Sequence, residues 1–155
     1  MGQKQMQFRN ITRDDLREVS ELGVRSKATW GYSDEVMAVF TEELTHDVEL
    51  IDQSLEAIVA CVDEKIVGYF TLVRRNDDSI ELDFMFVRVE SMLNGVGTAM
   101  MHEAVRLARS HGAEHLWLIA DPNAVGFYEK FGAKQTSEYQ SSIPGRTIPV
   151  MRIDL

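Results

Sequence analysis

The spacing of apolar residues divides the chain into alternating extended and helical segments. Residues 6–11 alternate apolar and polar side chains, a pattern that predicts a short strand. Two segments with apolar residues at helical spacing follow, and each starts at a good N-cap, Thr12 in the first and Ser33 in the second. The chain is therefore predicted to begin with a strand and two helices, one ending near Thr29 and one reaching Leu44.

The middle of the chain, after an expected loop over residues 45–53, has a period of two and many β-branched residues. This pattern is typical of an antiparallel meander. Three strands are predicted, at residues 55–62, 66–73 and 80–87. Short polar segments at 63–65 and 76–79 are expected to form the turns between them.

Residues 87–98 connect the third of these strands to an amphipathic segment at 99–114. They include Gly95 and Gly97, so the stretch is predicted to run from a strand through a glycine loop into a helix N-terminus. Glycine lets backbone amides approach a ligand closely, and a helix N-terminus has unpaired N–H groups. Such a place suits a phosphate or pyrophosphate, although a lone G-x-G also fits an ordinary turn from strand to helix.

The last third of the chain continues the alternation. An apolar segment at 114–120 follows the long helix, which predicts a buried strand parallel to 80–87 through a right-handed crossover. A short helix at 123–131 and two strands at 133–140 and 147–153 complete the chain. The predicted order is β-α-α-β-β-β-α-β-α-β-β, without repeats or linkers, in one domain over residues 1–155.

The composition argues against several classes of protein. The 155 residues have a net charge of −9, whereas a nucleic-acid binder usually has a basic patch. The acidic balance is compatible with a cationic small substrate and equally with solubility alone. A single cysteine, Cys61 in a predicted buried strand, excludes an intrachain disulfide, and the histidines show no metal-ligand spacing, so no metal is expected. A polar start and the lack of a long apolar run predict a cytoplasmic protein with no membrane contact.

Two motifs relate the chain to a known family. They are Met92-Leu93-Asn94-Gly95-Val96-Gly97 and, at residues 121–133, D-P-N-A-V-G-F-Y-E-K-F-G-A. Together with the order of elements they resemble the GNAT family of acetyl-CoA-dependent N-acetyltransferases. The family's phosphate motif has Gln or Arg, two residues, Gly, one residue, then Gly or Ala. Gly95 and Gly97 match this motif, whereas Met92 stands where the family has Gln or Arg. The second motif is similar to the family's Asn followed by a Phe-Tyr pair.

The resemblance implies an α/β fold with a mixed α+β sheet, mostly antiparallel, and a splayed parallel pair in its centre. It also implies that acetyl-CoA is the acyl donor. The pantetheine arm would bind the opened edge of the strand carrying Val87 and Val89, and the pyrophosphate would bind backbone amides of the glycine loop. The positions that match the cosubstrate site are Val87, Val89, Asn94, Gly95, Val96, Gly97, Thr98, Asn123, Phe127 and Tyr128.

Three residues are candidates for the chemistry. Tyr128 matches the family tyrosine near the thioester sulfur, where it would act as a general acid or bond the departing thiolate; a core tyrosine is the alternative. An amine is mostly protonated at neutral pH, so a base assists its attack. Glu81 matches a glutamate base of one branch of the family, and Asp83 is expected on the same strand face. Both also fit ordinary solvent-facing carboxylates, and a water chain is a further alternative.

Trp30 and Tyr32, between the first two helices, match the region that forms a wall of the family's acceptor site. Arg146 in the last loop would face the same pocket and bind an acceptor carboxylate. Packing of Trp30 and solvation of Arg146 are the alternatives. The leading hypothesis is acetyl transfer from acetyl-CoA to a primary amine of a small molecule by direct attack. A regulatory module that binds acyl-CoA without turnover is the alternative, and a homodimer is common in such families.

Overall fold

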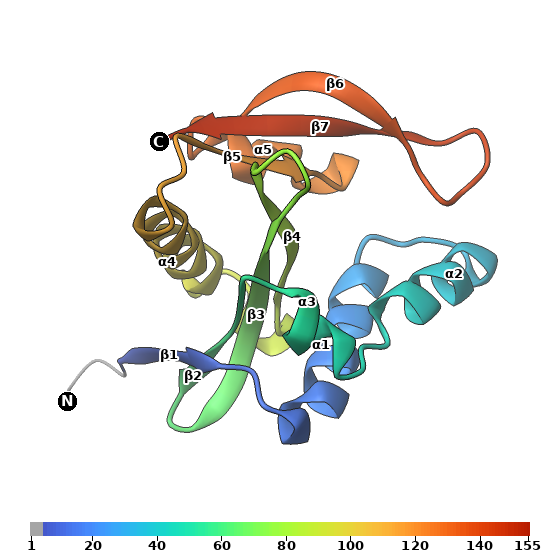
Figure 1. The fold of residues 1–155 in the computed structure, drawn as a ribbon. Helices are drawn as coiled ribbons and strands as arrows, with labels where there is room; N and C mark the ends of the chain where they lie inside the picture. Colours follow the sequence, from blue (N-terminus) through green and yellow to red (C-terminus); the bar gives the residue numbers. More distant parts are fainter. Residues whose placement is uncertain (1–4) are drawn as a thin grey trace.

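A computed structural model describes residues 5–155 and shows a twisted seven-stranded sheet (Figure 1). Its strands are β1 (Met6–Asn10), β2 (Glu56–Val62), β3 (Lys65–Arg74), β4 (Ile80–Val87), β5 (His115–Ile119), β6 (Lys134–Gln140) and β7 (Thr147–Asp154). Their order is β1-β2-β3-β4-β5-β7-β6. Among the described strands, only β4 and β5 pair in parallel, and every other neighbouring pair is antiparallel. The predicted mixed sheet with one central parallel pair is confirmed.

Helices pack on the two faces of this sheet (Figure 1). They are α1 (Leu16–Ala28), α3 (Glu49–Gln53), α4 (Val96–Ser110) and α5 (Val125–Glu129), whereas α2 (Asp34–Leu44) packs against α1. The predicted caps form: Thr12 and Asp15 make a capping box at the 3-10 turn η1 (Arg13–Asp15), which runs directly into α1, and the Ser33 hydroxyl accepts a hydrogen bond from the Val36 amide (3.3 Å). Within residues 5–155, no helix has the length and apolar character needed to span a membrane.

The sheet separates two clusters of buried apolar side chains, one on each face. The cluster on the α4 face includes Ile80, Leu82, Met100, Leu116 and Met151. The cluster on the α1 face includes Val19, Leu22 and Tyr69, with Leu50 of the α3 helix and Phe84 packed against it. Side chains on one face of β4 belong to the first cluster and those on its other face to the second. The strand β4 therefore lies at the centre of the molecule.

Several predicted boundaries are wrong. The expected loop at 45–53 contains α3, a helix too short to show a helical period. The long helix begins at Val96 rather than 99 and ends at Ser110. Val89 does not continue β4, because it begins a 3-10 helix, η2 (Val89–Ser91). The short helix expected at 123–131 is a 3-10 turn, η3 (Pro122–Ala124), followed directly by α5.

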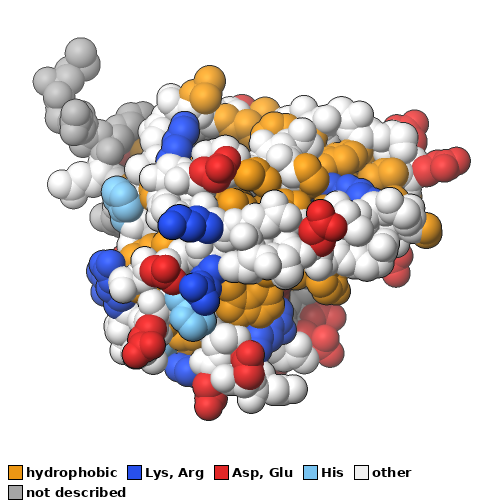
Figure 2. Space-filling view, turned by 90° about the horizontal axis from the view of Figure 1, so that it is seen from above, with side chains coloured by type: hydrophobic (Ala, Val, Ile, Leu, Met, Phe, Trp, Pro, Cys, Tyr) orange, Lys and Arg blue, Asp and Glu red, His pale blue; other side chains and the backbone are white. Residues whose placement is uncertain are grey.

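The β6–β7 hairpin covers one end of the molecule, and Figure 2 shows that end from above. Every residue of the edge strand β6 is exposed. Apolar side chains gather in several groups on this face, with basic and acidic side chains scattered among them (Figure 2). The loop at the tip of the hairpin, residues 141–146, reaches back to the α1–α2 connection, where Arg146 bonds Tyr32.

Candidate active site

The parallel strands β4 and β5 separate part-way along their length. Their pairing covers Ile80 to Leu82 of β4 and Leu116 to Leu118 of β5. Beyond Leu82, β4 continues to Val87 without a strand partner on its β5 side within the described chain. Past Leu118, β5 pairs only with β7. The two facing edges therefore leave backbone N–H and C=O groups available to an extended ligand.

A β-bulge lies at the point where the strands separate. Thr71 pairs with Phe84, and the next residue of β3, Leu72, pairs with Leu82, so Asp83 is an extra residue in β4. The bulge directs both Asp83 and Phe84 toward the α1–α3 face, because both line a cavity there. The Phe84 amide donates a hydrogen bond to the buried Thr71 hydroxyl (3.2 Å), which fixes the irregular backbone.

The N-terminus of α4 follows the far end of β4, after η2. Gly95 caps the helix with φ of +78°, a left-handed conformation that favours glycine. The first helical bond runs from the Ala99 amide to the Gly95 carbonyl (3.1 Å), so the amides of residues 96–98 have no acceptor within the helix. Leu93 just before it also has a positive φ, and its side chain is fully exposed.

Gly97 has a packing role that sequence reasoning missed. A Cβ atom at this position would lie 3.2 Å from the Phe127 ring. The missing side chain thus lets α5 approach the first turn of α4. The Phe127 ring also packs edge-on against Tyr128 and Phe131, with centroids 5.2 Å apart in both pairs. These aromatic contacts hold Phe127 and Tyr128 together beside the first turn of α4.

Tyr128 is half-buried, and no hydrogen bond to its hydroxyl is present within residues 5–155. Burial raises the pKa of Tyr128 above its usual range, and the negative charge of Asp121 raises it further. The phenol therefore keeps its proton at neutral pH and can donate a hydrogen bond to a ligand.

Glu81 and Asp83 share one arginine. The Arg75 guanidinium donates to Glu81, with Nε 2.6 Å from Oε1, and its Nη2 lies 3.7 Å from Asp83 Oδ1. The Glu81 side chain is 4% exposed, whereas that of Asp83 is 31% exposed. Burial raises the pKa of both carboxyl groups, and the ion pair with Arg75 opposes that rise.

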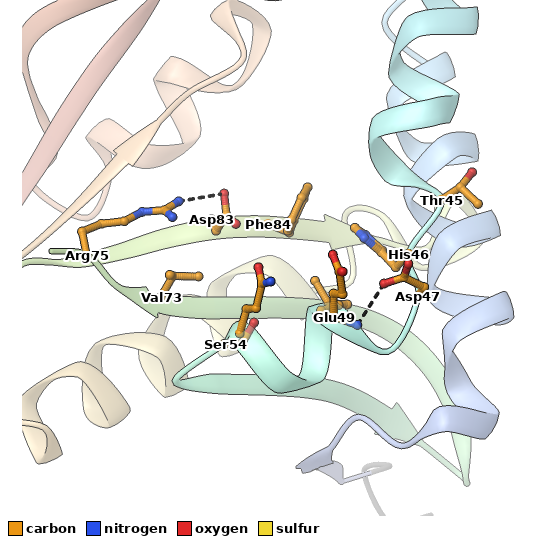
Figure 3. A pocket seen from close by; sticks show the side chains of 11 residues that line it. Thr45, His46, Asp47, Glu49, Ser54, Val73, Arg75, Asp83 and Phe84 are labelled. Carbon is orange, nitrogen blue, oxygen red and sulfur yellow. Dashed lines mark hydrogen bonds and ion pairs between the residues drawn. The ribbon is translucent and has the colours of Figure 1, made fainter.

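A cavity of about 280 Å³ opens on the α1–α3 face next to Asp83 (Figure 3). Its charged walls are Asp47, Glu49, Asp83 and Arg75, and Phe84 and Leu50 provide apolar contact. His46 also lines it; burial lowers the pKa of His46 to about 4, so the ring is neutral at pH 7. The cavity wall therefore has three carboxylates and one cation, Arg75. Arg75 is already paired with Asp83 in the wall and with Glu81 next to it.

A second polar cluster surrounds Asp121, directly after β5. Asp121 accepts hydrogen bonds from Lys27 Nζ and the Tyr32 hydroxyl, both at 2.6 Å. Arg146 and Asn123 donate to the same hydroxyl, at 2.8 and 3.3 Å. Burial and Asp121 together raise the pKa of Tyr32 to about 12. Tyr32 and Arg146 thus lie together, but their polar groups face each other and Asp121, whereas Trp30 lies outside this cluster and is 44% exposed.

The fold and these motifs agree with a family model described as the acetyltransferase (GNAT) family, which matches residues 12–133. The chain belongs to the GNAT acetyltransferase family. The curated relatives of this GNAT chain include an uncharacterized N-acetyltransferase of Mycobacterium tuberculosis, 32% identical over 88 residues. That match covers 55% of this chain and 56% of the relative, so the chain spans about half the length of the curated relatives it matches.

Solved GNAT structures share the whole fold. A GCN5-related N-acetyltransferase from Rhodopseudomonas palustris superposes with a TM-score of 0.84 at 22% identity, covering 100% of this chain and 99% of that one. The PaiA N-acetyltransferase from Thermoplasma acidophilum, in complex with coenzyme A, gives a TM-score of 0.80 at 19% identity over 97% and 99% of the two chains. At these identities the likeness establishes the fold, with coenzyme A bound in the second protein.

The structure brings together most of the residues expected at the cosubstrate site of this GNAT chain. Val87 and Phe127 both lie close to Gly97, within the Asn94–Thr98 stretch at the start of α4, and the Tyr128 ring packs against Phe127. Asn123 instead bonds Asp121 and Tyr32. Sequence reasoning missed Arg75, His46, Lys27 and Asp121; of these, only Asp121 stood in a quoted motif.

Proposed function

We propose that this protein transfers an acetyl group from acetyl-CoA to a primary amine of a small molecule, by direct attack of the amine. The observation that carries the proposal is the divergence of β4 and β5 beyond Leu82 and Leu118, which opens backbone groups beside the unpaired amides of α4. Membership in the GNAT family supports acetyl transfer in general. The direct route needs no protein nucleophile.

The residues present fit the donor. The open edge of β4 up to Val87 supplies main-chain groups for an amide-bearing arm, and the amides of residues 96–98, after the Gly95 cap, suit a pyrophosphate. The loop has Met92 where the family has Gln or Arg, so we assign phosphate binding to backbone amides rather than to a side-chain charge. When bound, acetyl-CoA supplies an electrophilic thioester carbonyl.

Tyr128 is proposed to stabilise the departing thiolate. Its raised pKa makes complete proton transfer to a thiolate unfavourable, because a cysteine-like thiol has a pKa of about 8.5. A hydrogen bond donated by the phenol still stabilises charge that develops on the sulfur. We therefore assign Tyr128 the role of hydrogen-bond donor rather than of a full general acid.

Asp83 is the better placed of the two candidate bases. The bulge turns it into the cavity, and its side chain remains partly exposed, whereas Glu81 is almost completely buried and held by Arg75. The raised pKa of Asp83 also brings it closer to that of the amine whose proton it must accept. Glu81 then serves to hold Arg75 next to Asp83.

The acceptor is proposed to enter the cavity on the α1–α3 face. The three carboxylates of its wall favour a cationic amine over an anionic acceptor. A cavity of about 280 Å³ suits a small molecule, since ligand pockets usually have about 300–1,000 Å³. Trp30, Tyr32 and Arg146, which were expected in the acceptor wall, do not line this cavity.

Calorimetry with acetyl-CoA and a thiol-release assay with a panel of amines test the proposal. The panel includes alkyl monoamines, alkyl diamines, amino acids, aminosugars and a short peptide with a free N-terminus. Acetyl-CoA binding together with thiol release that depends on a small amine supports it. Tight binding without amine-dependent release from any member would favour an acyl-CoA-binding regulatory module instead. Release with the peptide alone would contradict a small-molecule acceptor.

A further inference from the structure

Asp121 lies where three distant parts of the chain meet the end of β5. One carboxylate oxygen serves its own loop: Oδ1 accepts hydrogen bonds from the Asn123 amide (2.8 Å) and from Asn123 Nδ2 (3.0 Å). These bonds cap η3, and η3 leads directly into α5, the helix that contains Tyr128. Asp121 therefore fixes the start of the segment that positions the proposed hydrogen-bond donor.

The other carboxylate oxygen bonds to the opposite side of the site. Oδ2 accepts from Lys27 of α1 and from Tyr32 of the α1–α2 connection, both at 2.6 Å. Arg146, in the loop between β6 and β7, donates to the Tyr32 hydroxyl, and its Nη2 lies 3.8 Å from Oδ2. A single side chain thus ties α5 to the helical hairpin and to the β6–β7 hairpin.

The cluster is closed by its own members. The side chains of Asp121, Lys27 and Arg146 are 9%, 13% and 19% exposed. Both cations also lie over the rings of Tyr32 and Phe40, at 4.5–5.7 Å from the ring centroids. The polar groups here already pair with one another through hydrogen bonds and ion pairs. The arrangement therefore fits a structural contact between elements better than a binding site for an acceptor carboxylate.

We propose that Asp121 is a positioning residue that holds Tyr128 at the β4–β5 divergence by joining α5 to α1 and to the β6–β7 loop. This role rests on the proposed function, because it acts through Tyr128. Its negative charge also adds to the rise in the pKa of Tyr128 that burial causes. Loss of Asp121 would leave acetyl-CoA binding at α4 intact and impair the step that needs Tyr128.

The substitution D121N separates the two sets of bonds. Asparagine keeps one oxygen, which still accepts from the Asn123 amide, but it presents an NH₂ group to Lys27 and Tyr32 in place of Oδ2. The NH₂ group and the Lys27 ammonium are then two donors that face each other, so the bond to α1 and the ion pair with Arg146 are lost. We expect kcat for the most active amine of the panel to fall about 10- to 100-fold, with KM for acetyl-CoA within about twofold.

A double-mutant cycle shows whether the effect passes through Tyr128. In a Y128F background, D121N should lower kcat by less than about twofold, because the group that it positions is already absent. Full additivity of the two substitutions would overturn the proposal. Y32F is a milder second variant, since it keeps the ring and removes the bonds to Asp121, Arg146 and Asn123. We expect it to lower kcat as D121N does, but by a smaller factor.

D15N is the matched control. Asp15 is similarly buried, with a side chain 11% exposed, and it also pairs with an arginine, Arg9, at 2.7 Å, but it lies before α1 and away from the divergence. It should lower the melting temperature as D121N does and leave kcat unchanged. Equal kcat losses in D15N and D121N would reduce Asp121 to a general stabilising role.

Hydrogen exchange gives a readout that needs no turnover. Amides of residues 121–132 should exchange faster in D121N than in the wild type and D15N, since α5 loses its ties. Unchanged exchange there overturns the positioning role whatever the activity. Absence of amine-dependent thiol release from the wild type would instead refute the proposed function, and with it the role assigned through Tyr128.

Discussion

Replacing Glu81 with glutamine tests which carboxylate takes the proton from the amine. Arg75 contacts Glu81 closely, whereas its Nη2 lies 3.7 Å from Asp83. Glutamine has nearly the same shape without the charge, so Asp83 becomes the nearest anionic partner of Arg75. We expect the guanidinium to move toward Asp83, and the pKa of Asp83 to fall, because a closer cation favours the ionised carboxylate.

The distance gives the size of this effect. Shortening the N–O separation from 3.7 Å to about 2.8 Å strengthens the attraction by about 1.4 kcal/mol at an effective dielectric constant of about 20. That energy corresponds to about one pKa unit. The Arg75 side chain is 43% exposed, and solvent screening reduces the gain. The acidic limb of the kcat profile should therefore move down by about half to one pH unit.

The assay is amine-dependent thiol release measured across the pH range from about 5 to 9. E81Q should keep kcat above the limb within about threefold of the wild type, whereas D83N should lower kcat about 100-fold or more and remove the acidic limb. The opposite result, in which the limb survives D83N and disappears in E81Q, would refute the assignment of Asp83 as the base. Survival of the limb in both variants would indicate a water chain.

Three further substitutions have expected outcomes. Tyr128→Phe should lower kcat about 100-fold while the calorimetric Kd for acetyl-CoA changes less than about twofold; a kcat near that of the wild type would remove its role. Gly68→Ala should cost about 2 kcal/mol in urea unfolding, because a Cβ would lie 2.6 Å from Met100 Sδ and 2.9 Å from the Phe86 carbonyl oxygen; an unchanged midpoint would contradict this packing. Asp15 has a pKa lowered from 3.8 to about 2 by its arginine partner, so its charge stabilises the fold above pH 4, and that contribution is lost as the pH falls through 2. Asp15→Asn should therefore lose about 1–2 kcal/mol at pH 7 and approach the wild type near pH 2, with a constant difference counting against the ion pair.

Local patterns predicted most of the elements, because strand periodicity and helix caps depend on neighbouring residues. The strand at Ile80–Val87 has the predicted bounds, and Ser33 caps the predicted second helix. The start of α4 was placed three residues late, since glycine disfavours a helix and Gly97 lies in its first turn. The α3 helix was missed because five residues do not complete a recognisable helical period.

The site was only partly predictable for a related reason. Motifs identified Tyr128 and the glycines, and spacing identified Glu81 and Asp83 as a pair. The bulge that gives these two carboxylates different surroundings depends on the register with β3, which local spacing does not show. The ties of Asp121 to Lys27 and Tyr32 span 94 and 89 residues, and contacts over such separations leave no periodic signal in the sequence.

The sheet also separates the two proposed substrate entrances. The unpaired amides of α4 belong to one face, and the cavity beside Asp83 belongs to the other, with the β4–β5 divergence between them. A donor bound on one face would leave the other entrance open. Both substrates could therefore be bound at once, before any product leaves. We therefore expect intersecting double-reciprocal plots and no exchange of labelled CoA into acetyl-CoA without an amine. Parallel plots would instead indicate a covalent acetyl-enzyme intermediate, formed before the amine binds.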